Sequence, residues 1–153
     1  MNTYKQAVIL LVEDDLGDQK LTKQALCGDR VGNELKIVNN AEEAIEYLNN
    51  AQQGKPGFPM PDLILLDLNM PGLGGREFLR RQKDIPALEI IPVVVLTTSD
   101  SDKDILESYK LQAAGYIRKP ANLEGFRETM KDLTDYWFVI CRRVEKDSTV
   151  LAV

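Results

Sequence analysis

Apolar runs that end in polar residues recur along the chain, and they predict the strands of a sheet. We expect five strands, near Val8–Val12, Leu35–Val38, Leu63–Leu66, Val93–Leu96 and Tyr116–Ile117. The first and third runs are almost unbroken, which is typical of strands that helices cover on both faces. The pattern therefore indicates a parallel sheet buried inside the molecule.

Between the strands, apolar residues recur at helical spacing, as Ala41, Ala44 and Leu48 do. This spacing predicts helices near Asp18–Cys27, Ala41–Gln52, Gly75–Lys83 and Lys103–Leu111, and a last helix that begins near Leu123. Strands and helices that alternate in this way form a doubly wound α/β fold, because crossovers between parallel strands are right-handed. We expect a five-stranded parallel sheet of strand order 2-1-3-4-5.

Polar residues that follow the strands should gather at one edge of this sheet, where open α/β sheets keep their sites. They are Glu13 and Asp14 after the first strand, Asp67 and Asn69 after the third, Thr97 at the end of the fourth and Lys119 after the fifth. Each of these residues has a simpler interpretation when it is taken singly. The acids are typical of turns and helix starts. Thr97 is typical of the end of a strand, and Lys119 is typical of a solvated surface. Their convergence favours a common site.

The acids in such a site need a cation beside them. Two carboxylates about 4 Å apart repel each other by roughly 4 kcal/mol at an effective dielectric near 20. Mg²⁺ (or Mn²⁺) fits best, because it takes oxygen ligands and is typically held by one or two carboxylates together with a phosphate. In that setting Asp67 is a nucleophile that forms an acyl phosphate, and Lys119 and Thr97 stabilise the phosphoryl oxygens.

Composition narrows the function classes. The chain has 153 residues, of which 44% are hydrophobic and 28% charged, so we expect one domain with a substantial core. A net charge of −5 argues against nucleic acid as a partner. No apolar stretch approaches the roughly 20 residues of a membrane span, and the two cysteines lack metal-binding spacing. We therefore expect a cytoplasmic protein without a membrane partner.

The chain contains no histidine. This excludes Ser/His and Cys/His catalysis, histidine metal sites and a phosphohistidine of the protein's own. A Gly-rich phosphate loop that ends in Lys-Ser or Lys-Thr is also missing. Any phosphoryl group must therefore come from another molecule.

At this point the chain resembles the receiver domains of two-component response regulators, which have a flavodoxin-like fold. The matching motifs, in order, are V-E-D-D (Val12–Asp15), L-D-L-N-M-P-G (Leu66–Gly72), L-T-T (Leu96–Thr98) and G-Y-I-R-K-P (Gly115–Pro120). Their order and spacing fit the family from about Val8 to Trp137. Within it, the chain looks most like the stand-alone phytochrome-associated response regulators.

The resemblance implies a role for each matching residue. Asp67 would be the phosphoacceptor, Glu13 and Asp14 would bind Mg²⁺ with it, and Asn69 would lend its backbone carbonyl to the metal. Thr97 and Lys119 would be the switch hydroxyl and the phosphate-binding lysine, and Tyr116 the aromatic residue of the switch. The partner would be a sensor histidine kinase, with a phytochrome-like one as a specific candidate. Beyond self-catalysed phosphotransfer and autodephosphorylation the protein would not be an enzyme.

Two details of this family resemblance concern the loops beside the site. The family carries a cis peptide bond where Lys119 meets Pro120, so we expect one here. The chain departs from the family at Gly72-Leu73-Gly74-Gly75, where many receivers have an acid before the last glycine. We expect the extra glycine to loosen this loop and to alter kinetics without loss of function.

Three other readings of the sequence remain open. A phosphorylation-independent adaptor would show loss of Asp67, of an acid of the pair or of Lys119, and none is lost. A metal-dependent phosphatase usually carries a second acid two residues after its nucleophile, where this chain has Asn69. A flavin-binding domain would need a phosphate loop after the first strand, and the acids there would repel the phosphate.

The last helix is expected to exceed what the core needs. We expect a single receiver domain over residues 1–138 and a C-terminal helical extension over residues 139–153, without a separate output domain. Apolar residues recur at alternating spacings of three and four, at Leu123, Phe126, Met130, Leu133, Trp137, Ile140 and Val144. The first half should pack on the sheet, and the second half predicts a homodimer interface that includes Trp137 and Ile140.

Overall fold

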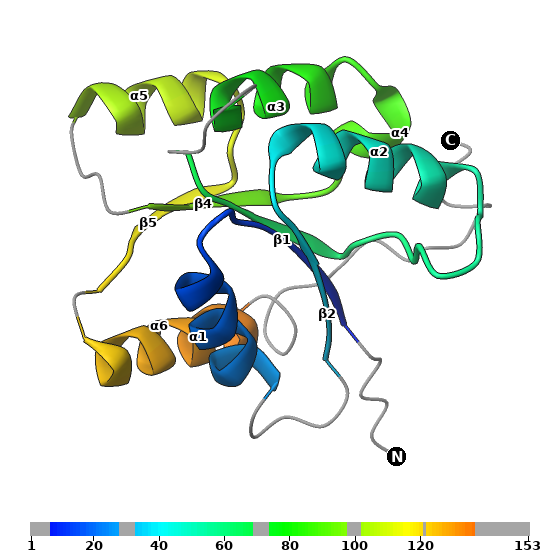
Figure 1. Ribbon diagram of the computed structural model, residues 1–153. Coiled ribbons are helices and arrows are strands. Elements are labelled where there is room, and N and C mark those ends of the chain that lie inside the picture. Colours follow the sequence, from blue (N-terminus) through cyan, green and yellow to red (C-terminus); the bar gives the residue numbers. More distant parts are fainter. Residues whose placement is uncertain (1–6, 28–32, 69–73, 98–101, 121, 137–153) are drawn as a thin grey trace.

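A parallel sheet of five strands forms the centre of the computed structural model, which describes residues 7–27, 33–68, 74–97, 102–120 and 122–136 (Figure 1). The strands are β1 (Val8–Val12), β2 (Glu34–Val38), β3 (Leu63–Leu66), β4 (Val93–Thr97) and β5 (Gly115–Arg118). Their order is β2-β1-β3-β4-β5, and every neighbouring pair is parallel. The predicted doubly wound sheet is confirmed.

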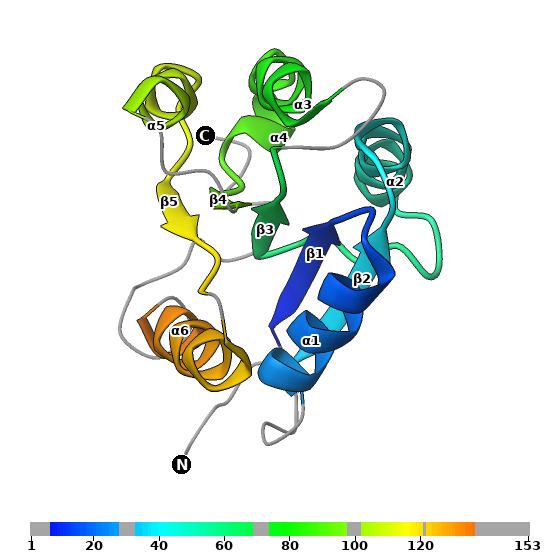
Figure 2. The same ribbon diagram turned by 60° about the vertical axis from the view of Figure 1, so that its left-hand side comes forward.

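Helices cover both faces of the sheet, so that the molecule has three layers (Figures 1 and 2). One face carries α1 (Leu16–Cys27) and α6 (Leu123–Asp135). The other carries α2 (Ala41–Gln52), α3 (Gly74–Lys83), α4 (Pro86–Glu89) and α5 (Asp102–Lys110). This arrangement leaves the carboxyl ends of the strands as the open edge at which a site can form.

Two hydrophobic clusters lie on the opposite faces of the sheet, and alternate residues of each inner strand belong to different clusters. In β1, Leu10 packs toward α2 and α3, whereas Leu11 packs toward α1 and α6. The same alternation separates Ile64 from Leu65 in β3. Because both faces are covered, these strands read as continuous apolar runs.

The α6 helix packs on α1 with its apolar stripe. Phe126, Met130 and Leu133 are buried in the cluster on that face. Leu123, the first residue of the stripe, is 42% exposed. Apart from Leu123, the first half of the predicted stripe therefore serves the core of the fold itself, as expected, while Trp137 and Ile140 lie outside the described residues.

The structure differs from the sequence prediction at two places. The helix α4 was not predicted, because four residues with Pro86 in the first turn are too short to show a helical period. The described residues also contain no cis peptide bond, so the bond between Lys119 and Pro120 is trans, against expectation. The trans form is the ordinary preference of such bonds by about 0.5–1 kcal/mol.

No helix in the described part of the chain is both long and apolar enough to cross a membrane.

Candidate functional site

The backbone ladder of the sheet continues past the strand ends and sets the site residues side by side. Glu13 follows β1, Asp67 follows β3 and Lys119 follows β5. The N–H of Asp67 donates to the carbonyl of Val12 at 3.1 Å, and the N–H of Lys119 donates to the carbonyl of Thr97 at 2.7 Å. Residues that are far apart in the sequence therefore meet at the carboxyl edge of the sheet.

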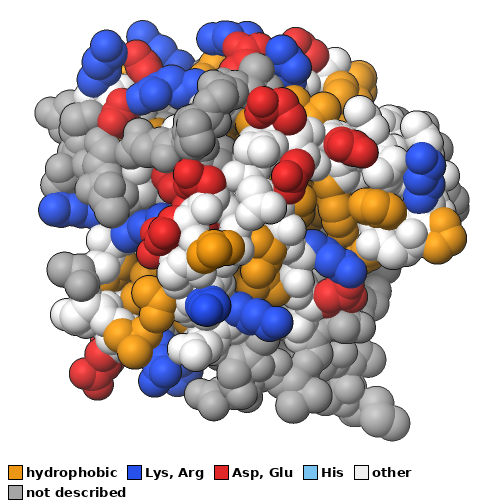
Figure 3. Space-filling view, in the orientation of Figure 1, with side chains coloured by type: hydrophobic (Ala, Val, Ile, Leu, Met, Phe, Trp, Pro, Cys, Tyr) orange, Lys and Arg blue, Asp and Glu red, His pale blue; other side chains and the backbone are white. Residues whose placement is uncertain are grey.

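Three carboxylates converge at this edge. One oxygen from each of Glu13, Asp14 and Asp67 lies within 4.8 Å of the other two. Glu13 and Asp67 are only 2% and 8% exposed, whereas Asp14 is exposed. Acidic side chains gather near the middle of the molecular face that Figure 3 shows. The predicted acids are thus brought together, with one of them open to solvent.

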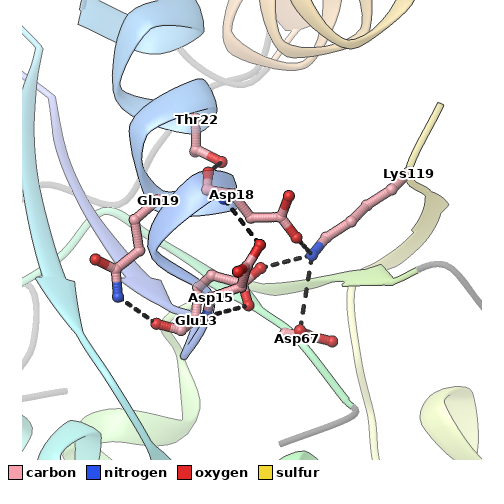
Figure 4. A network of polar contacts seen from close by, with 7 residues as sticks. All are labelled: Glu13, Asp15, Asp18, Gln19, Thr22, Asp67 and Lys119. Atoms are coloured by element: carbon pink, nitrogen blue, oxygen red, sulfur yellow. Dashed lines mark hydrogen bonds and ion pairs between the residues drawn. The ribbon is translucent and has the colours of Figure 1, made fainter. Parts of the chain in front are cut away.

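The Lys119 ammonium lies among the acids (Figure 4). Its Nζ is 2.5 Å from Oε1 of Glu13, 2.8 Å from Oδ2 of Asp18 and 3.6 Å from Oδ2 of Asp67. The lysine side chain is 8% exposed, so these pairs are shielded from water. Lys119 therefore supplies a counter-charge that the carboxylate cluster requires.

Burial and neighbouring charges shift two pKa values in this network. Burial raises the pKa of Glu13 to about 7; the hydrogen bond from Lys119 opposes this rise, and the Asp67 carboxylate adds to it. For Lys119, burial alone would lower the pKa, but hydrogen bonds to Asp18 and Glu13 outweigh it and raise the pKa. Lys119 is therefore a fixed positive charge, and ionised Glu13 gains from a further cation nearby.

Hydrogen bonds to α1 hold the loop that carries the acidic pair. The buried Gln19 amide donates to the backbone carbonyl of Glu13 at 2.6 Å and to Oδ1 of Asn39 at 2.8 Å. Oδ2 of Asp15 accepts the N–H of Asp18 at 3.1 Å in the first turn of the helix. The position of Glu13 is thus fixed from both the helix and the neighbouring strand.

Close backbone packing fixes Asp67 from the other side. A Cβ added to Gly75 would lie 2.8 Å from the carbonyl oxygen of Asp67 and 2.9 Å from Cα of Leu68. Gly74 has a φ of 81°, a left-handed conformation that favours glycine. The departure from the family pattern at Gly74 thus suits the local backbone.

Thr97 and Tyr116, the residues predicted to form a switch, lie on the neighbouring strands β4 and β5. Thr97 is fully buried at the end of β4. Tyr116 stands opposite Val95 in the register of β4 and β5, is half-buried, and packs against the cluster beneath α2 and α3. Asn69 lies outside the described residues.

The donor set of the site suits a hard divalent cation. Carboxylate oxygens are the ligands that Mg²⁺ and Mn²⁺ prefer, and one exposed acid leaves room for water and phosphate oxygens. A lysine at the same edge adds a second positive charge directed at the Asp67 carboxylate. The arrangement can therefore place a metal ion and an ammonium around the Asp67 carboxylate.

Comparison with known proteins defines the class to which this fold and site belong. The family model of the response regulator receiver domain matches residues 9–131. The chain belongs to this family, and is a receiver-domain response regulator of two-component signalling, whose phosphodonor partners are in general histidine kinases. Receiver domains bind divalent metal ions, which agrees with the acidic cluster.

Individual response regulators that are similar to this chain include proteins named for phytochrome signalling. Response regulator Rcp1 of Synechocystis sp. is 40% identical over 131 residues, which are 85% of this chain and 88% of that protein. The phosphorylated cyanobacterial phytochrome response regulator RcpA superposes with a TM-score of 0.83 at 38% identity, over 92% of this chain and 99% of that one. The Mn²⁺-bound form of Rcp1 gives 0.80 at 35% identity, over 91% and 99% of the two chains.

Two members of the polar network are absent from the sequence prediction. Asp18 contacts Lys119 across the site, and Gln19 anchors the backbone of Glu13. Both lie in the first turn of α1, where polar residues are common at any helix start. Their roles come from contacts with Lys119 and with the backbone of Glu13, so the local sequence carries no signal that singles them out.

Proposed function

We propose that Asp67 accepts a phosphoryl group from a histidine kinase in a Mg²⁺-dependent reaction, and that the phosphorylated protein signals through contacts with other proteins. The observation that carries this function is the place of the Asp67 carboxylate, which lies beside the acids Glu13 and Asp14 and 3.6 Å from the Lys119 ammonium. The similarity to RcpA, which has been solved in a phosphorylated form, supports it.

The chemistry follows from the groups at the edge of the sheet. An oxygen of the Asp67 carboxylate attacks the phosphorus of a phosphohistidine, so that a P–O bond forms as the P–N bond breaks. The electron pair of that bond leaves with the imidazole, which takes up a proton. The Lys119 ammonium and the Thr97 hydroxyl donate to the phosphoryl oxygens and stabilise their charge in the transition state.

Glu13, Asp14 and Asp67 are the side chains that would hold the metal, with the backbone carbonyl of Asn69 as a further ligand. When bound, Mg²⁺ neutralises charge on the phosphoryl oxygens. Mn²⁺ takes the same kind of ligands, and the Mn²⁺-bound form of Rcp1 supports a divalent ion in this family.

Phosphorylation is tested with acetyl phosphate, which replaces the kinase as donor. We expect the intact mass of the wild type to rise by one phosphoryl group in Mg²⁺ and to stay unchanged in EDTA. Asp67→Asn should remain unmodified in both conditions. Asp15→Asn, which removes a neighbouring exposed carboxylate, is the matched control and should be modified like the wild type. A wild type that stays unmodified with Mg²⁺ would favour a phosphorylation-independent adaptor.

We further propose that the kinase partner is phytochrome-like. The support is the similarity to RcpA, described as a cyanobacterial phytochrome response regulator, and to a structure described as a response regulator in red light signalling of R. palustris, with a TM-score of 0.83 at 28% identity. Phosphotransfer from a panel of purified histidine kinases tests this, and a phytochrome-like kinase should transfer fastest.

We also propose a homodimer through the last helix. In the described part of α6, Phe126, Met130 and Leu133 are used by the receiver core. The stripe continues in the sequence at Trp137 and Ile140, and we propose that these residues form the contact with a second chain.

A further inference from the structure

Asp18 binds the site lysine from outside the acidic cluster. Its Oδ2 lies 2.8 Å from Nζ of Lys119, closer than the 3.6 Å that separates this nitrogen from Oδ2 of Asp67. Among the described residues, the acids that converge as a possible metal site are Glu13, Asp14 and Asp67, and Asp18 is not one of them. Asp18 therefore holds the ammonium without belonging to the metal cluster.

The geometry of an ammonium group explains why two partners matter. Lys119 has three N–H donors and no acceptor. Glu13 and Asp18 each accept a hydrogen bond, at 2.5 Å and 2.8 Å. The Asp67 oxygen at 3.6 Å is beyond hydrogen-bond distance. Two acceptors thus fix the ammonium and leave a donor for an oxygen on the Asp67 side (Figure 4).

A metal ion in the cluster would change this balance. A divalent cation bound by Glu13 competes with Lys119 for the same carboxylate, and its charge repels the ammonium. Asp18 is then the carboxylate that stays with the lysine. Its side chain is only partly exposed. Two hydrogen bonds fix its backbone: the N–H of Asp18 donates to Oδ2 of Asp15, and the hydroxyl of Thr22 donates to the carbonyl of Asp18.

We propose that Asp18 is a positioning residue, which keeps the Lys119 ammonium in the site while a divalent cation occupies Glu13, Asp14 and Asp67. This assignment rests on the metal-dependent phosphoacceptor function proposed above. It explains how two cationic groups share one acidic edge, because Asp18 adds the further negative charge on the side of the lysine.

A simpler explanation is that Asp18 is an acid of the first helical turn, stabilised there by the helix dipole. Asp15 gives the matched comparison, because it lies three residues before Asp18, at the start of the same helix, and carries the same charge. Its carboxylate accepts the N–H of Asp18 instead of an ammonium hydrogen. If the helix dipole or the net charge were the cause, substitution of Asp15 and substitution of Asp18 would have the same effect on Lys119. If Asp18 retains Lys119, only substitution of Asp18 would have an effect.

The test measures acylation of Lys119 by acetic anhydride at one pH, with and without saturating Mg²⁺, by peptide mass spectrometry on the full chain. In the wild type and in Asp15→Asn, Mg²⁺ should change the labelling of Lys119 by less than about twofold, because its carboxylate partner remains. In Asp18→Asn, Mg²⁺ should raise this labelling by about fivefold or more, because the ammonium has lost the one neighbouring carboxylate that does not bind the metal. Asp18→Glu should restore protection.

Lys36, paired with Glu34 on β2, is the internal reference for the fold. If its labelling rises in Asp18→Asn, the variant is destabilised, and Asp18→Ser takes its place. An equal effect of Mg²⁺ on Lys119 in the wild type and the Asp18 variant would overturn the proposal, as would an equal rise in Asp15→Asn. The labelling of Lys119 requires no phosphoryl transfer. A wild type that fails to become phosphorylated would therefore refute the proposed function, and the labelling experiment would still decide separately whether Asp18 retains Lys119.

Discussion

At Gly75, the main chain of α3 passes directly behind the residue that we propose as phosphoacceptor. Gly75→Ala places a Cβ against two backbone atoms, the nearer being the Asp67 carbonyl at 2.8 Å. Such overpacking should lower the free energy of unfolding by about 1–3 kcal/mol. Urea denaturation measures the loss, and acetyl phosphate labelling should slow as Asp67 is displaced.

Gly17→Ala is the control for this substitution. A Cβ at Gly17 would meet Oδ2 of Asp15 at 3.5 Å, which is ordinary contact. Alanine in place of a helical glycine should raise stability by about 0.5–1 kcal/mol. If Gly75→Ala is as stable as Gly17→Ala, the close packing behind Asp67 does not constrain the site.

Asp14 should control the response of the protein to divalent cations. Bound Mg²⁺ should stabilise the fold by RT ln(1 + [L]/Kd), about 2.7 kcal/mol at a concentration of 100 times Kd. Asp14→Asn should raise the melting temperature of the metal-free protein, because it relieves repulsion with Glu13 and Asp67, and should abolish the rise with Mg²⁺. Scanning calorimetry with and without EDTA measures both effects.

Asp15→Asn serves as the control for Asp14, since it removes an exposed charge from the same loop and keeps a side chain that caps α1. It should retain the stabilisation by Mg²⁺. An Asp14→Asn protein that Mg²⁺ stabilises as strongly as the wild type would place the metal elsewhere.

The sequence predicts the site role of a residue when that residue directly follows a strand. Asp67 and Lys119 directly follow strands, so the sheet topology alone brings them to one edge. The partner role of Asp18 depends on how α1 crosses toward the end of β5, which no local pattern encodes. The demand for glycine at position 75 comes likewise from a contact between separate segments.

At the scale of elements, α3 and α5 are tied together on one face of the sheet. The Arg76 guanidinium of α3 pairs with Asp104 and with Glu107 of α5, the latter at 2.7 Å. Lys and Arg side chains alternate with Asp and Glu over these helices in Figure 3. Because Thr97 and Tyr116 lie on β4 and β5, the strands before and after α5 in the chain, we expect activation to be read out at this surface.

Beryllofluoride, which mimics the phosphoryl group, should therefore shift the amide resonances of α5 and β5 in the presence of Mg²⁺. Asp67→Asn should show no such shifts, because it cannot hold the adduct. Backbone NMR makes the measurement. Shifts confined to the immediate neighbours of Asp67, with α5 unchanged, would contradict Thr97 and Tyr116 as a switch.

The sequence predicts the elements whose pattern of apolar residues is strong, and it predicts elements with a weak pattern only in part or not at all. The inner strands β1 and β3 are apolar on both faces and stand out in the sequence. The edge strand β5 has only half-buried or exposed residues, and two of its four residues were predicted. The short α4 helix exists because it packs Leu88 into the core and accepts a hydrogen bond from the Gln82 amide, both tertiary effects.

At the scale of the whole molecule, the last helix should decide the oligomeric state. We expect light scattering to give the mass of a dimer for the wild type at tens of micromolar, a range in which moderate association is populated. Trp137→Glu and a truncation after Asp135 should both be monomeric, because each removes apolar surface beyond the part of α6 that the core uses.

Leu106→Glu is the control. Leu106 lies on α5, on the opposite side of the sheet from α6, and is 56% exposed, so this substitution should not disturb a dimer contact made through α6. It should remain dimeric. A wild-type mass of one chain, with or without beryllofluoride, would remove the dimer.

The central claim is that the carboxyl edge of this sheet makes Asp67 the phosphoacceptor. Borohydride reduction after treatment with acetyl phosphate and Mg²⁺ tests it most directly, because it converts an aspartyl phosphate to homoserine and leaves a free carboxylate unchanged. Peptide sequencing by mass spectrometry should find homoserine at position 67 in the wild type and nowhere in Asp67→Asn. Homoserine at another acid, or a wild type without any, would contradict the assignment.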